Sequence, residues 1–200
     1  MIISRLYIIK NIIVFCSIIF FGCSTTNDGI PKSFKNHFPK KGQVTILFEG
    51  KSCYDKDIKH EGAWHIIIVQ DEEGLLNRKL DTLIETSISK VSYNDSCVIK
   101  VPNRFEGDYN VNSTLIKHYE LNNCIFIPDF SGIIDFMEYD IDSFTRDFMF
   151  YIIENKPGQY LEKERLLLDS GIPEPWSNGL SRGIAINDQT EEIIFWVEIW

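Results

Sequence analysis

The segment from Ile193 to Trp200 constrains the fold more than any other part of this 200-residue sequence, because both of its faces are mostly apolar. In an extended strand, side chains alternate between two faces. One face would hold Ile193, Phe195, Val197 and Ile199, and the other Ile194, Trp196, Glu198 and Trp200. A strand with two apolar faces is covered on both sides, so we expect it near the middle of a sheet. Polar residues 187–190 predict a turn that pairs it with 183–186 in a hairpin.

Short β-branched or aromatic runs bounded by turn residues predict further strands. They are Val44–Phe48, Trp64–Val69, Val98–Val101, Ile125–Ile127 and Phe148–Ile153. Asn155-Lys156-Pro157-Gly158 predicts a turn directly after the last of these strands. Residues 92–97, with Asn94 and Asp95 at the tip, predict a second hairpin.

Helix is predicted in fewer places. Residues 160–168 carry leucines among charged residues and are followed by Gly171 and Pro173, which predicts a short helix that ends there. Residues 75–88 carry apolar side chains at helical spacing, but the β-branched residues within 82–88 favour a strand, which we expect there. Together these elements predict an α+β fold, mostly an antiparallel β-sheet with one or two short helices.

The N-terminal end differs in character from the rest of the chain. Arg5 and Lys10 precede an almost wholly apolar run over 11–21, which stops at Gly22 and is followed by Cys23. The run is too short to cross a bilayer comfortably as a helix, so we expect a cleaved export signal. An uncleaved N-terminal anchor helix is the alternative interpretation.

The segment Phe20-Phe21-Gly22-Cys23 resembles the lipobox of bacterial lipoproteins, with Phe20 where the family usually has Leu. The resemblance implies that residues 1–22 are removed as a signal peptide and that Cys23 receives lipid. It implies a protein that is anchored to a membrane of the cell envelope. Ser24 after the cysteine implies the outer membrane of a two-membrane bacterium.

The sequence that follows Cys23 is polar and basic up to Gly42, without apolar periodicity. We expect the lipidated N-terminus and a flexible linker over 23–42, and a single globular β-rich domain over 43–200. Four lysines of the linker could touch anionic headgroups, although a solvated linker is the simpler interpretation. They are Lys32, Lys35, Lys40 and Lys41.

The chain is acidic, with 20 Lys and Arg against 29 Asp and Glu and a net charge of −9, or −11 once Arg5 and Lys10 leave with the signal. This balance argues against a nucleic-acid partner, because attraction to phosphate dominates such binding.

Three cysteines remain for the domain: Cys53, Cys97 and Cys124. An oxidising compartment would allow one disulfide among them. No pair has the Cys-x-x-Cys spacing of a redox motif or zinc ribbon. We interpret Cys97 and Cys124 as small buried side chains within strands.

No pattern predicts catalysis, a cofactor or a metal site. Gly179 to Gly183 fits G-x-S-x-G around Ser181, but a strand follows instead of a helix, and no histidine comes later. Residues 108–112 have the opening spacing of a calcium-binding loop without its glycine at the sixth position. The four histidines show no ligand spacing, and we interpret His65 as a partly buried structural residue.

Three residues are candidates for ligand binding. Trp176 follows Pro173-Glu174-Pro175 in a rigid loop that could expose its ring as a stacking platform for a glycan. Asp140 and Asp142 belong to an acidic cluster, and strand alternation would place both on one face. Paired carboxylates can serve glycoside hydrolysis or bind metal. A solvated acidic face is the simpler interpretation.

Two hypotheses about function stay open. The first is a non-catalytic, membrane-tethered interaction module that binds another envelope component; it predicts exposed apolar or acidic patches and no buried titratable cluster. The alternative is a surface glycan-binding or glycan-processing lipoprotein, which predicts a concave site holding Trp176 beside Asp140 and Asp142. We favour the first, because the sequence shows no catalytic constellation.

Overall fold

The structure is a computed structural model, and it describes residues 28–40, 42, 44–52, 62–71, 74–101, 124–165, 172 and 174–200. The predicted signal, Cys23, Cys53 and the possible calcium loop at 108–112 all lie outside these residues. Within the described ranges, no helix combines the length and the apolar character needed to span a membrane.

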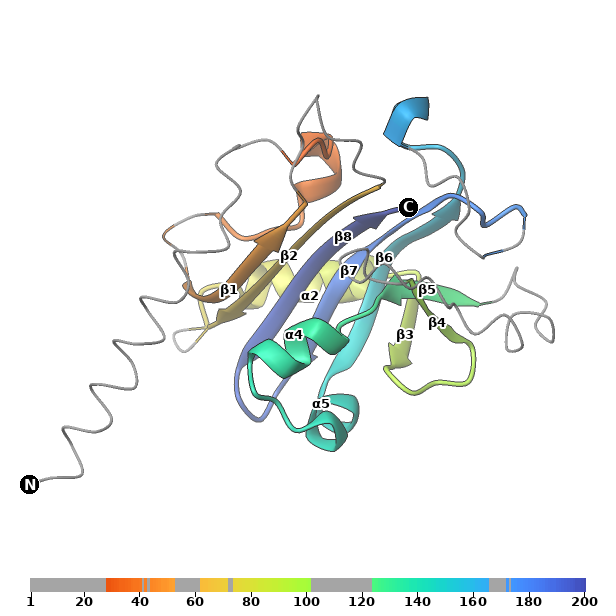
Figure 1. The fold of residues 1–200 in the computed structure, drawn as a ribbon. Helices are drawn as coiled ribbons and strands as arrows, with labels where there is room; N and C mark the ends of the chain where they lie inside the picture. The colour runs from red at the N-terminus through yellow and green to blue at the C-terminus, as the bar shows by residue number, and fades with distance from the viewer. Residues whose placement is uncertain are drawn as a thin grey trace, which may run out of the picture.

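Six strands form one antiparallel sheet in the order β1-β2-β8-β7-β6-β3 (Figure 1). They are β1 (Thr45–Lys51), β2 (Ala63–Gln70), β3 (Ser89–Ser92), β6 (Met149–Pro157), β7 (Gly179–Asn187) and β8 (Glu192–Ile199). A second sheet pairs two parallel strands, β4 (Val98–Val101) and β5 (Ile125–Pro128). The predicted α+β fold with a mainly antiparallel sheet is confirmed.

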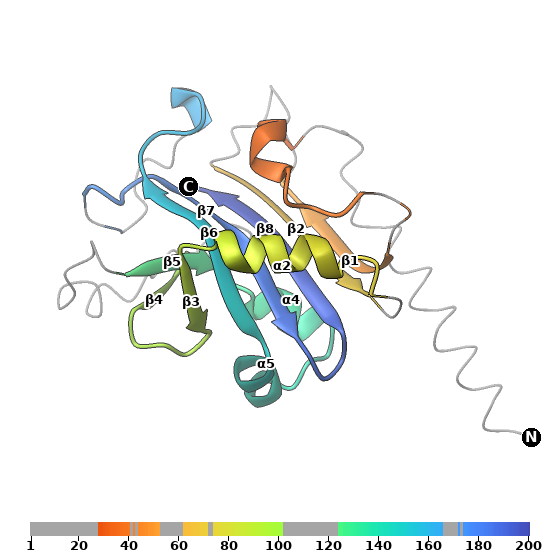
Figure 2. The same cartoon turned by 180° about the vertical axis from the view of Figure 1, so that it is seen from behind.

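Helices cover both faces of the large sheet. Figure 2 shows α2 (Asn77–Thr86) lying across one face. On the other face lie α4 (Ser131–Phe136) and α5 (Ile141–Asp147). Two short 3-10 helices, η1 (Lys32–Lys35) and η3 (Lys163–Arg165), lie at the end of the sheet opposite α5. The result is three layers with the sheet in the middle.

Strand β8 occupies the central position that its sequence predicted. It lies between β2 and β7, and the predicted C-terminal hairpin is present. Ile194 and Trp196 pack in the core beneath α4 and α5. The alternate residues Ile193, Phe195, Val197 and Ile199 pack in the core beneath α2. Burial of both faces explains why the strand has almost no polar positions.

The strand predicted for residues 82–88 is wrong, because these residues continue helix α2 as far as Thr86. Leu80, Leu83 and Ile84 form an apolar stripe at helical spacing that packs on the sheet. Main-chain N–H groups at the start of the helix donate to the carboxylate of Asp71. Burial of the stripe outweighs the weak strand preference of β-branched residues.

The hairpin predicted at residues 92–97 is also wrong. The turn itself forms, since the N–H of Asp95 donates to the carbonyl of Ser92 over 3.1 Å. The flanking strands do not pair with each other: β3 pairs with β6, and β4 pairs in parallel with β5. A turn sequence fixes only the local reversal of the chain, while strand partners are chosen by burial elsewhere.

Two local predictions are shifted. Strand β6 continues through the predicted turn to Pro157, and its main chain pairs with β7 up to that residue. Of the helix predicted over 160–168, the described part contains only the short helix η3, and residues 166–171 lie outside the description.

Residues 28–40 belong to the folded domain, although the sequence assigned them to the linker. Ile30 and Phe38 are buried in the core beneath α2, and Asp28 and His37 are buried beside them. The sequence did not predict this because the segment is held largely by polar contacts, which leave no apolar periodicity in the sequence.

Candidate functional site

Trp176 is not an exposed platform, which corrects the prediction for its loop. Its side chain is only 4% exposed. The ring stacks on Phe126 with centroids 4.2 Å apart, and it lies parallel to the ring of Trp200. The main-chain carbonyl of Trp176 also accepts a hydrogen bond from the indole N–H of Trp200. These contacts make Trp176 a core residue that locks the C-terminal end of β8.

Asp140 and Asp142 lie on helix α5, so the strand alternation predicted for them is wrong. Asp140 is the N-cap residue, and its carboxylate accepts hydrogen bonds from the main-chain N–H and the hydroxyl of Ser143. Asp142 lies in the first turn, where a negative charge is favourable. The helix packs through Phe144 in a different cluster from that of Trp176. The described contacts therefore do not bring the three predicted ligand residues together.

Ser181 is a buried strand residue. It lies within β7 with no exposed surface, and its hydroxyl accepts a hydrogen bond from the indole N–H of Trp196 over 3.3 Å. A nucleophile has to be reachable by substrate, so this position does not support one.

The most elaborate polar arrangement is where residues 28–40 meet the rest of the domain. Arg165 is 7% exposed, and its guanidinium donates hydrogen bonds to the main-chain carbonyls of Asp28, Gly29 and Gly62. Gly29 has a positive φ of 70°, and a Cβ at this position would collide with the guanidinium. One buried arginine thus joins the start of the described chain to the start of β2.

Two further cations hold the same segment. Arg182, on β7, donates to the carbonyls of Ser33 and Phe34 and is itself fixed by a 2.8 Å ion pair with Glu154. Lys79, on α2, donates to the carbonyl of Phe38. Together with Arg165, these side chains come from three different elements, so the path of the segment across the sheet is fixed along its length.

An ionic cluster around the buried residues Asp28 and His65 lies at the beginning of the segment. The carboxylate of Asp28 accepts a hydrogen bond from Lys35 at 2.8 Å and lies 3.1 Å from Nδ1 of His65. The Nδ1 contact is an ion pair without the alignment of a regular hydrogen bond. On the other side of the ring, Nε2 lies 3.0 Å from a carboxylate oxygen of Glu49. The interaction-module hypothesis had predicted no such cluster.

The two carboxylates favour the charged imidazolium form of His65. Ionised carboxylates only accept hydrogen bonds, and both ring nitrogens face one, so both nitrogens carry protons. Burial alone would lower the pKa of His65, but Asp28 and Glu49 outweigh it and raise this pKa. Burial alone would raise the pKa of Asp28, but His65 and Lys35 outweigh it and hold this pKa well below its usual range.

This pairing decides what the cluster can do chemically. With a carboxylate on each nitrogen, His65 has none left to accept a proton from a substrate, as a general base must. Among the residues that the structure covers, no group of three His, Cys, Asp or Glu side chains is arranged to hold a metal ion. The cluster is suited to fixing the N-terminal segment in place.

His37, within residues 28–40, is a second buried histidine, and its ring has the opposite charge state. Its Nε2 lies 2.9 Å from the carbonyl of Trp196, so this nitrogen carries the proton and donates. Burial lowers the pKa of His37 to about 4, which keeps the ring neutral at physiological pH.

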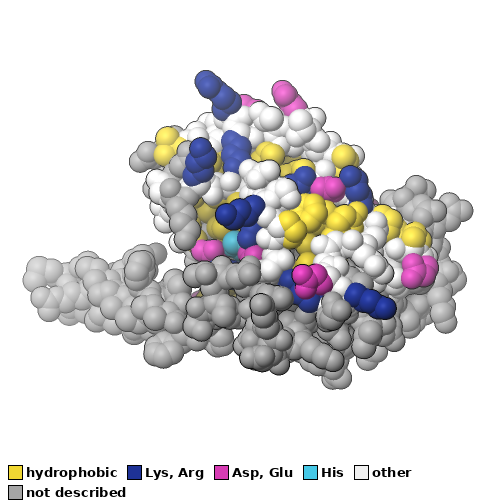
Figure 3. Space-filling view, turned by 90° about the horizontal axis from the view of Figure 1, so that it is seen from above, with side chains coloured by type: hydrophobic (Ala, Val, Ile, Leu, Met, Phe, Trp, Pro, Cys, Tyr) yellow, Lys and Arg dark blue, Asp and Glu magenta, His cyan; other side chains and the backbone are white. Residues whose placement is uncertain are grey.

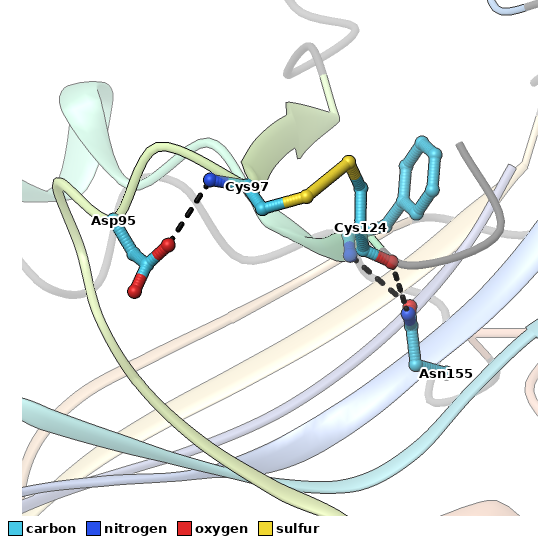
Figure 4. Close-up of a disulfide and its surroundings, with 5 residues drawn as sticks. Asp95, Cys97, Cys124 and Asn155 are labelled. Atoms are coloured by element: carbon cyan, nitrogen blue, oxygen red, sulfur yellow. Dashed lines mark hydrogen bonds between the residues drawn. A yellow bond between two sulfur atoms is a disulfide. The ribbon is translucent and has the colours of Figure 1, made fainter. Parts of the chain in front are cut away.

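Cys97 and Cys124 form a disulfide, which corrects their interpretation as merely small buried side chains within strands (Figure 4). The bond joins the residues that immediately precede β4 and β5, 27 positions apart in the sequence. The amide of Asn155, on β6, donates to the carbonyl of Cys124 and accepts from the N–H of Phe126. The small sheet is therefore tied to the large one beside the disulfide.

The α4–α5 end has a different surface. Phe136 and Ile141 are 49% and 50% exposed, and the ring of Phe136 lies 5.5 Å from that of Phe48 on β1. Residues 131–147 also contain five carboxylates against one arginine, and all but Asp147 of these carboxylates are exposed. This end combines exposed apolar side chains with negative charge.

The polar contacts at the N-terminal segment could not be found from the sequence, because their members lie far apart in it. Asp28 and Arg165 are separated by 137 positions. Comparison with known proteins adds no assignment: no protein family, no curated protein and no solved structure matches this chain.

Proposed function

We propose that this protein is a lipid-anchored protein of the cell envelope, attached through Cys23, whose domain is a non-catalytic interaction module for another envelope protein. The proposed binding surface is the α4–α5 end. The outer membrane of a two-membrane bacterium is the proposed location, on the strength of Ser24 following the lipidated cysteine.

The observation that carries this proposal is the exposure of Phe136 and Ile141 among carboxylates. Large apolar side chains gathered at one surface, rimmed by charge, are typical of protein-binding sites. The glycan hypothesis needed an exposed Trp176 beside Asp140 and Asp142, and the burial of Trp176 removes its main support.

The disulfide supports the export part of the proposal. Disulfides persist in oxidising compartments such as the bacterial periplasm and the cell surface, and they are rare in the cytosol. The bond between Cys97 and Cys124 is thus in keeping with a chain that leaves the cytoplasm.

The anchor is tested by growing cells with an alkyne-labelled fatty acid and comparing the wild type with Cys23→Ala. We expect the label on a wild-type chain that lacks residues 1–22, and no label on the variant. A mature chain that begins elsewhere, or an unlabelled Cys23, would refute lipidation.

The partner surface is tested by placing a photo-crosslinking amino acid at position 136 in living cells. Position 88 is the matched control, since Ile88 is also exposed, at 61%, but lies immediately before β3. We expect a discrete crosslinked envelope protein from position 136 that is lost in the Ile141→Glu variant. Equal crosslinking from both positions would argue against a specific surface.

A further inference from the structure

We infer that the end of the domain carrying η1 and η3 is a membrane-facing surface that contacts anionic lipid headgroups, so that the α4–α5 end points away from the bilayer. This inference rests on the proposed lipidation of Cys23, and it adds an orientation and a second ligand, the headgroup layer.

The first argument is reach. Only residues 24–27 separate Cys23 from Asp28. Five residues of fully extended chain span at most about 18 Å, so Asp28 stays within that distance of the lipidated residue. The sequence predicted a linker up to residue 42, but the segment from Asp28 is held on the sheet by Arg165, Arg182 and Lys79. The domain is therefore kept close to the bilayer surface.

The second argument is the charge around Asp28. Lys32 and Lys163 are exposed, and Lys163 lies two residues before the arginine that binds the carbonyl of Asp28. Lys51, half-buried, is the strand partner of His65, whose ring contacts the Asp28 carboxylate. Glu162 and Glu49, the latter in contact with His65, are exposed carboxylates in the same region. Lysines near a membrane attract anionic lipids.

The third argument is the contrast with the rest of the molecule. Figure 3 looks down on the end that carries η1 and η3, and it shows Lys and Arg side chains spread around a hydrophobic strip, with Asp and Glu side chains among them. The whole chain has a net charge of −9, and the α4–α5 end carries five carboxylates against one arginine. An anionic surface would repel the α4–α5 end and attract the other, so anchor and charge favour the same orientation.

The test is amine footprinting of the full lipidated protein. The protein is reconstituted into vesicles of phosphatidylcholine, with or without phosphatidylglycerol, and acetylation of each lysine is followed by mass spectrometry. Lys90 is the internal control, because it is exposed on β3, at the edge of the sheet farthest from β1. We expect acetylation of Lys32 and Lys163 to slow several-fold relative to Lys90, and more strongly in the phosphatidylglycerol vesicles.

A pair of double variants sharpens the result. In Lys32→Gln/Lys163→Gln, the protection of Lys51 should weaken by roughly fivefold for each lysine removed. The matched double variant Lys90→Gln/Lys100→Gln should leave that protection unchanged.

The outcomes separate this inference from the proposed function. The mass of the N-terminal peptide reports lipid on Cys23 in the same sample. A lipidated chain whose Lys32 and Lys163 react as fast as Lys90 in both vesicles would overturn the orientation alone. A chain without lipid on Cys23 would overturn the proposed function and the orientation with it.

Discussion

Two helix-containing segments lie on the same sheet, near opposite ends, and they are held to it in opposite ways. Residues 28–40 are held by cationic side chains from three other elements and by a buried carboxylate. Residues 131–147 are held by apolar side chains, chiefly Ile133, Ile134 and Phe144, and turn most of their carboxylates outward.

The difference shows how two kinds of contact serve two roles. Hydrogen bonds and ion pairs are directional, so they fix the path of a segment that has little apolar surface of its own. Apolar packing is non-directional, and it leaves the outer face of a helix free to carry Phe136 and exposed charge. In the function that we propose, residues 28–40 lead to a membrane anchor and have to keep their direction, whereas the α4–α5 end binds a partner and has to stay accessible.

The largest difference between the two ends is expected when one aspartate is removed at each. Asp28→Ala leaves His65 and Lys35 without their shared carboxylate, and breaking a buried ion pair costs about 4 kcal/mol of unfolding free energy. Asp140→Ala removes only a helix cap at the surface, so the loss should be clearly smaller. Urea unfolding measures both, and equal losses would mean that the Asp28 cluster contributes no more than a surface cap.

Breaking the disulfide should destabilise the whole domain and loosen the α4–α5 end most. Cys97→Ser with Cys124→Ser should lower the unfolding free energy by about 3 kcal/mol, because the bond closes a long loop in the unfolded chain. Strand β5 leads directly into α4, so hydrogen exchange should rise more in residues 131–147 than in residues 28–40. A reductant should reproduce the effect in the wild type and do nothing further to the double variant.

Two glycines with positive φ separate backbone strain from the arginine contact. Gly29→Ala strains the backbone and pushes the guanidinium of Arg165 out of place, and we expect a loss of about 2 kcal/mol. Gly42→Ala meets no atom within 4 Å, so only the backbone strain remains, about 1 kcal/mol. Thermal unfolding compares the two variants, and the same loss in both would show that the Arg165 contact contributes little.

The two buried histidines, His37 and His65, should make the stability of the domain depend on pH with opposite signs. The pKa of His37 is lowered to about 4, so its contribution to stability is lost as the pH falls from 6.5 towards 4. The pKa of His65 is raised above 6.5, so its contribution is present below 6.5 and lost as the pH rises through the raised value.

The contribution of these two histidines to the free energy of unfolding should therefore be highest near pH 6.5. His65→Gln should flatten the alkaline side and His37→Gln the acid side. If His65→Gln lost as much unfolding free energy above pH 6.5 as the wild type, the assignment of His65 as an imidazolium would be contradicted.

The sequence predicted those parts of the fold in which burial follows a simple period. The alternation in 193–200 predicted a central strand and its hairpin, and β4 was predicted with its exact bounds. Partnership between distant segments was not predictable: the parallel pairing of β4 with β5 depends on residues that the local pattern does not reveal. The disulfide was left open for the same reason, since three cysteines allow several pairings.

The sequence predicted less of the candidate site than of the fold. Residue type suggested that Trp176 and the two aspartates could bind a ligand, but the tryptophan is buried and Asp140 caps a helix. The ionic cluster combines Asp28, Glu49 and His65 from three separate segments, and only the folded chain brings them together. Ile30 and Phe38 were the available hint that the proposed linker is packed, since both are large apolar residues in a polar stretch.

The central position of β8 has a consequence for the order in which the molecule is made. Until residues 192–199 have emerged from the ribosome, the β1–β2 pair has no strand to join it to β7, β6 and β3. The nascent chain therefore holds two unfinished half-sheets and completes its core only when β8, which follows all the other strands of this sheet in the sequence, has joined them. For a protein that we propose crosses a membrane unfolded, a sheet that cannot close without β8 delays folding and so favours translocation.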